Sequence, residues 1–64
     1  MLFDIVIIED EEVSPRVIKV KYGTTLRRVM TENGLQGEIQ NQFGKPLPLE
    51  MPLRGTATFI LRDL

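Results

Sequence analysis

The chain has 64 residues with a formal net charge of −1, and it contains no Cys and no His. This length predicts a single domain over residues 1–64, which buries only about 60% of its unfolded surface. The composition excludes disulfides, thiolate metal sites and iron–sulfur clusters, and it lacks the commonest general base. No apolar run reaches the ~18 residues of a membrane span. We therefore expect a cytoplasmic domain that binds no cofactor and no membrane.

Residues 2–8 (LFDIVII) and 16–22 (RVIKVKY) have the β-branched and aromatic content of strands. In the first, both faces are apolar except for Asp4, which predicts a central strand. In the second, Ile18, Val20 and Tyr22 share one face. The acidic connection is short, so we expect an antiparallel hairpin.

Charge is distributed unevenly along the chain. Residues 1–12 contain five acidic side chains and no basic ones, for −5, whereas residues 13–28 contain five basic side chains and no acidic ones, for +5. This asymmetry has two interpretations: a solvated turn beside a solvated strand, or a polarised surface that steers a charged partner.

The segment YGTTLRRVMTENGL, residues 22–35, has the clearest helical period. Leu26, Val29 and Met30 are spaced to share one helical face. Thr24 or Thr25 can cap the first turn, and Asn33-Gly34 can end a helix of about nine residues. Such a helix is too short to be stable alone, so it needs a sheet to pack on.

The remaining chain predicts a short strand over residues 37–43, a turn at 43–46 and a last strand over 56–61. Residues 47–53 (LPLEMPL) contain Pro48 and Pro52, which predicts an edge strand or an irregular crossing. In the last strand, Ala57, Phe59 and Leu61 are expected to face the core.

The order strand, strand, helix, strand, irregular edge, strand predicts an α+β fold of the β-grasp (ubiquitin-like) type. We expect a four- to five-stranded mixed sheet with one helix packed across one face, and a last strand parallel to the first. The residues expected on the helix-covered face are Phe3, Ile5, Ile7, Ile18, Val20, Leu26, Val29, Met30, Phe59 and Leu61.

Two stretches carry a family resemblance: Tyr22-Gly23-Thr24-Thr25-Leu26 and residues 41–55, NQFGKPLPLEMPLRG. They resemble the helix entry and the "NGK-x-VPLD-x-PLKDGD" stretch of TGS domains and of sulfur carriers similar to ThiS and MoaD. The resemblance implies the β-grasp fold. Sulfur carriers end in Gly-Gly, whereas the sequence given ends in Leu61-Arg62-Asp63-Leu64. We therefore expect no carrier activity, and a sulfur-carrier-like protein without its Gly-Gly tail remains an alternative.

Our first functional hypothesis is a protein-interaction module. The sheet face opposite the helix is expected to expose apolar side chains with a basic rim, a pattern typical of binding sites. The partner would be another protein or a second copy of this chain. The expected contact residues are Val6, Ile8, Val17, Lys19, Lys21, Ile60 and Arg62.

The alternative is nucleic-acid or nucleotide contact, because TGS domains occur in RNA- and nucleotide-handling proteins. Arg27 and Arg28 fall in the first helical turn, where cations oppose the helix dipole, and an anionic ligand would explain them. An enzyme is not expected: the best candidate pair, Asp4 with Lys19 or Lys21, is more simply a surface salt bridge.

Overall fold

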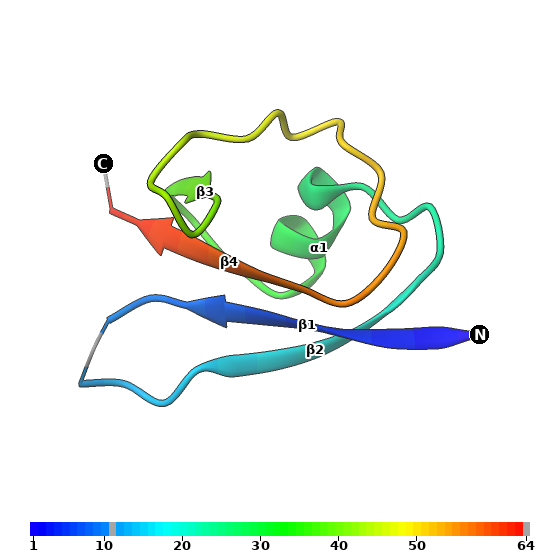
Figure 1. The fold of residues 1–64 in the computed structure, drawn as a ribbon, viewed down its shortest axis with the longest axis horizontal. Coiled ribbons are helices and arrows are strands. Elements are labelled where there is room, and N and C mark those ends of the chain that lie inside the picture. Colours follow the sequence, from blue (N-terminus) through cyan, green and yellow to red (C-terminus); the bar gives the residue numbers. More distant parts are fainter. Residues whose placement is uncertain (11, 64) are drawn as a thin grey trace.

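The computed structural model describes residues 1–10 and 12–63, which form four strands and one helix. The strands are β1 (Leu2–Ile8), β2 (Arg16–Lys21), β3 (Glu38–Gln40) and β4 (Ala57–Arg62), and the helix is α1 (Leu26–Glu32). The sheet order is β2-β1-β4-β3, and α1 packs across one face (Figure 1). The chain is therefore a small α+β protein with a four-stranded mixed sheet.

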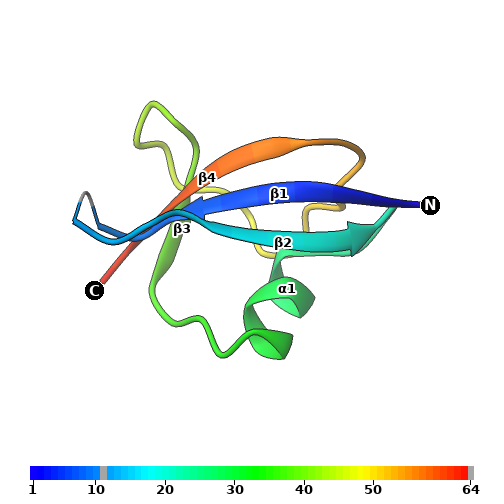
Figure 2. The ribbon, with the colours of Figure 1, turned by 90° about the horizontal axis from the view of Figure 1, so that it is seen from below.

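β1 lies in the interior of the sheet, as its two apolar faces predict. It pairs antiparallel with β2, where Val6 is opposite Val17, and parallel with β4, where Ile8 is opposite Ile60. β3 pairs antiparallel with the other edge of β4. Figure 2 shows the acidic connection and the C-terminal end of the chain at one end of the sheet, and the N-terminus at the other.

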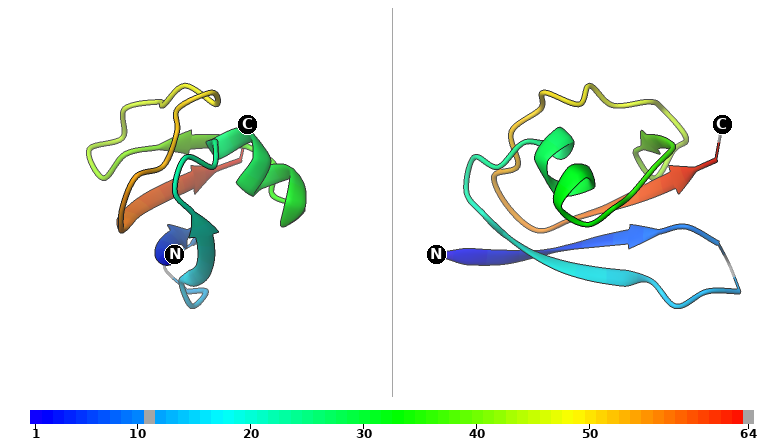
Figure 3. Two further views of the ribbon diagram at one scale, coloured as in Figure 1. Left: turned by 90° about the vertical axis from the view of Figure 1, so that its right-hand side faces the viewer. Right: turned by 180° about the vertical axis from the view of Figure 1, so that it is seen from behind.

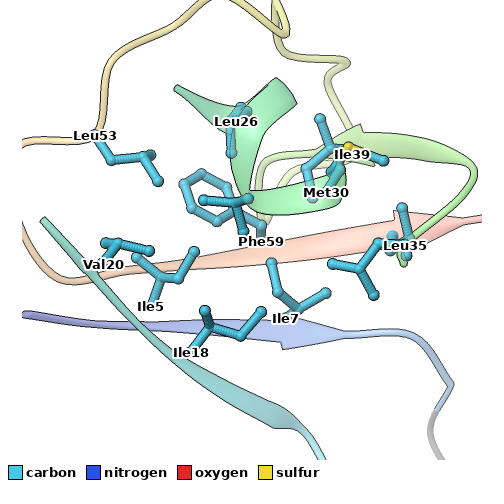
Figure 4. Packing of buried hydrophobic residues seen from close by; sticks show 12 residues of the cluster. Ile5, Ile7, Ile18, Val20, Leu26, Met30, Leu35, Ile39, Leu53 and Phe59 are labelled. Atoms are coloured by element: carbon cyan, nitrogen blue, oxygen red, sulfur yellow. The ribbon is translucent and has the colours of Figure 1, made fainter. Parts of the chain in front are cut away.

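The core lies between the sheet and the helix (Figure 4). Ile5 and Leu26 are fully buried and come from opposite layers. Of the ten residues expected on this face, nine are buried and Phe3 is half-buried. The other buried members of the cluster are Leu35 after the helix, Ile39 in β3 and Leu53 in the segment before β4.

The helix has seven residues instead of the expected nine or so. Thr25, one of the two expected caps, accepts a hydrogen bond from the Arg28 N–H through its side chain. At the other end, Gly34 has a φ of +65°, which glycine adopts without steric cost. Leu35 N–H then donates to Met30 C=O at 2.9 Å, so the chain turns back and buries Leu35.

Two strand predictions were too long. Tyr22 does not continue β2 toward the core and is 70% exposed, because the chain turns at Gly23, whose N–H donates to Leu53 C=O. The strand expected over 37–43 ends at Gln40. The Oδ1 atom of Asn41 accepts hydrogen bonds from the N–H groups of Phe43 and Lys45, which folds the chain into a turn two residues early.

The proline-containing segment, residues 46–53, is the irregular crossing rather than a strand. Its ladder pairing is limited to isolated bridges at Pro46 and Pro52, and single backbone hydrogen bonds join it to β3 and to the start of the helix. Leu53 is buried and Leu47, Leu49 and Met51 are half-buried against the core, so the apolar alternation still closes one side of it. The right-hand view of Figure 3 shows this segment running past the helix on the side away from β1 and β2.

Candidate interaction face

The structure brings the four apolar residues of the predicted contact set together on the sheet face opposite α1. Val17 faces Val6 across the β1–β2 pair, and Ile8 faces Ile60 across the β1–β4 pair. Side chains on one face of a strand are two residues apart, so Val6 and Ile8 are neighbours along β1 and the two pairs lie side by side. Val17 is 61% exposed and the other three are half-buried. We call these four residues the apolar strip.

Charged side chains border the apolar strip. Lys19 Nζ lies 2.9 Å from Asp4 Oδ1, and both side chains are about half or more exposed. An exposed pair of this kind contributes at most ~1 kcal/mol to stability and explains the closeness of the two groups without catalysis. Lys21 is paired across the strands with Leu2, and Arg62 with Glu38. All seven predicted contact residues therefore lie on this face.

Beside the apolar strip, a shallow hollow of about 350 Å³ is lined by Asp4, Val6, Thr58 and Gln42. Gln42 belongs to the loop that Asn41 organises, and its neighbour Phe43 is 94% exposed. Aromatic residues are common anchors of protein interfaces. The sequence analysis predicted a turn at 43–46 but placed Asn41 and Gln42 in the preceding strand, so the loop begins earlier than expected. The Asn41 and Gly44 spacing was the signal that indicated a turn.

The two arginines of the first helical turn each have a carboxylate partner. Arg27 is ion-paired with Glu50, and Arg28 Nε lies 3.4 Å from Glu32 Oε2. Glu50 lies 23 residues from Arg27, so this pairing was not readable from local sequence. The sequence analysis expected an anionic ligand to supply the negative charge beside Arg27 and Arg28. In the structure, Glu50 and Glu32 supply negative charge there.

The backbone donors of that turn are occupied as well. Leu26 N–H donates to Met51 C=O at 3.2 Å, and Arg27 N–H donates to Leu49 C=O at 2.8 Å. These N–H groups are the ones that an anion at a helix N-terminus would use. The anion site at Arg27 and Arg28 stays a prediction. In the structure, the backbone donors and the positive charges of this site already have partners within the chain.

A second hollow, of about 420 Å³, lies between the outer edge of β2 and α1. Its charged lining is Lys19, Lys21, Arg28 and Glu32. Two of the three cations have carboxylates within 3.4 Å, which leaves little unbalanced charge for a ligand.

Over residues 1–10 and 12–63, no group of three or more His, Cys, Asp or Glu side chains could hold a metal ion. Glu11, in the acidic connection, lies outside the described residues. Among the described helices none is both long and apolar enough to cross a membrane.

Comparison of the chain with protein-family models, with curated proteins and with solved structures finds no match.

Proposed function

We propose that this chain is a non-catalytic protein-interaction module that binds another protein, or a second copy of itself, through the open sheet face. The observation that carries the proposal is the apolar strip. Four aliphatic side chains lie adjacent to one another, and none of them is buried within the chain. Burying such side chains stabilises a complex by the same effect that stabilises a core, and charged rims are typical of interfaces.

We further propose that the fold is of the β-grasp type. The support is the order of elements: a β1–β2 hairpin, then α1 across the sheet, then a return strand, β4, parallel to β1. The stretches that resemble TGS domains and sulfur carriers form the helix entry and the irregular segment. They contact each other through Leu26 N–H to Met51 C=O and Leu53 N–H to Thr24 C=O.

The test is site-specific photo-crosslinking in cells that make the protein. A photoreactive phenylalanine analogue replaces Val17 in the apolar strip or, as a control, the exposed Thr31 on the helical layer. We expect a covalent adduct of discrete mass from position 17 and none from position 31. The proposal fails if position 17 forms no adduct, or if both positions give the same adducts.

A further inference from the structure

The open face has opposite charges at its two ends. Beyond one end of the apolar strip, the connection between β1 and β2 presents the exposed acids Glu9, Asp10 and Glu12. Beyond the other end, Lys19 and Lys21 project from β2 on the same face as Val17. Figure 2 shows the connection and the far end of β2 at opposite ends of the sheet.

Three of these charges have no ion pair with any other described residue: Asp10 and Glu12 at the acidic end and Lys21 at the basic end. Asp10 Oδ1 accepts a hydrogen bond from the Glu12 N–H at 3.0 Å, which leaves Glu12 and Lys21 as the two of these charged side chains without a partner among the described residues. Val17 lies between them on the same hairpin, five residues from Glu12 and four from Lys21. The apolar centre is therefore flanked along the hairpin by an available acid in the turn and an available base at the far end of β2.

We propose that the partner of the open face is a second copy of this chain, stacked face to face across a two-fold axis. The axis lies in the plane between the sheets and runs perpendicular to the strands. This inference rests on the proposed function and specifies its partner. The rotation places Val17 over Val17 of the second copy, and it places Glu12 of each copy over Lys21 of the other.

The charges select this arrangement over the other two-fold stacking. An axis parallel to the strands would place the acidic end over the acidic end and Lys21 over Lys21, which is repulsive. With the perpendicular axis, both ends carry opposite charges, as an isologous interface requires. Stacked sheets lie ~10 Å apart, a distance that a Lys and a Glu side chain reaching toward each other can span.

The size of the face sets the strength of the dimer. Three strands of six or seven residues and one of three, ~4.8 Å apart, cover roughly 350 Å² of flat sheet. Stable interfaces bury about 800 Å² per partner. The dimer is therefore weak, and it responds to protein concentration and, through its end contacts, to salt.

The test is sedimentation of the full chain over a concentration series at low salt, with charge-reversed variants. Lys21→Glu and Glu12→Lys each turn two attractive contacts per dimer into repulsive ones, so each raises the dimer dissociation constant by about tenfold. Thr31→Glu is the control, because Thr31 is exposed on α1, in the layer on the opposite side of the sheet from the apolar strip. We expect it to behave as the unmodified chain.

The decisive sample is an equimolar mixture of Lys21→Glu and Glu12→Lys chains. Each contact between the two variants again joins opposite charges, so dimerisation returns to the level of the unmodified chain. An unmodified chain that stays monomeric, single variants that dimerise normally, or a mixture that does not recover would each overturn the proposal. If position 17 nevertheless crosslinks to a protein of another mass, the interaction module stands and only the second copy is wrong. If position 17 gives no adduct, the interaction module itself fails.

Discussion

Gly37, just before β3, has a backbone that other residues rarely adopt. Its φ is +127°, and a Cβ atom built there would lie 2.3 Å from the carbonyl oxygen of Arg62. That oxygen belongs to the backbone of β4, so it cannot move away as a flexible side chain would. Gly37 therefore permits the close approach of β3 to β4.

Gly37→Ala should lower the free energy of unfolding by about 1–3 kcal/mol, from backbone strain together with the clash. A domain of this size has only about 3–10 kcal/mol in total. Urea denaturation measures the loss. Gly55→Ala is the control, because a Cβ there meets no atom within 4 Å and no positive φ is required. Equal effects of the two substitutions would contradict this account of Gly37.

At the scale of elements, local pattern predicted most of the structure. The alternation of residues 2–8 and 16–22 gave the hairpin and assigned Val17 and Ile18 to opposite faces. The errors lie where a single side chain redirects the backbone. The side chain of Asn41 ends β3 by accepting hydrogen bonds from two backbone N–H groups. Strand propensities do not account for such side-chain bonds to the backbone.

The helix start was left open between Thr24 and Thr25, and the structure assigns the cap to Thr25. Thr25→Ala should lower the free energy of unfolding by about 1 kcal/mol, because the Arg28 N–H loses its acceptor. Thr24→Ala should cost less than half of that, since the Thr24 contacts are made by its backbone. Thermal or urea denaturation of the two variants compares them directly. A larger loss for Thr24→Ala would contradict the assignment.

At the scale of the whole molecule, the central place of β1 and its parallel pairing with β4 followed from the element order and from the two apolar faces of β1, whereas the pairing of β3 with β4 was not predicted. Contacts distant in sequence could not be predicted in this way. Arg27 meets Glu50, and the first helical N–H groups meet residues 49 and 51. These contacts changed the interpretation of the arginines, whereas the open face depends only on strand alternation and was predicted from sequence.

The central claim is that the open face is a contact surface for a second copy. It is tested most directly by the amide chemical shifts of the full chain over a dilution series, measured by nuclear magnetic resonance. We predict concentration-dependent shifts at Val6, Ile8, Val17 and Ile60 that Val17→Asp abolishes and Thr31→Asp leaves in place. Val17 is 61% exposed, so an otherwise unchanged spectrum of Val17→Asp would establish that the fold is intact. Shifts that do not depend on concentration, or that cluster on α1 instead, would contradict the claim.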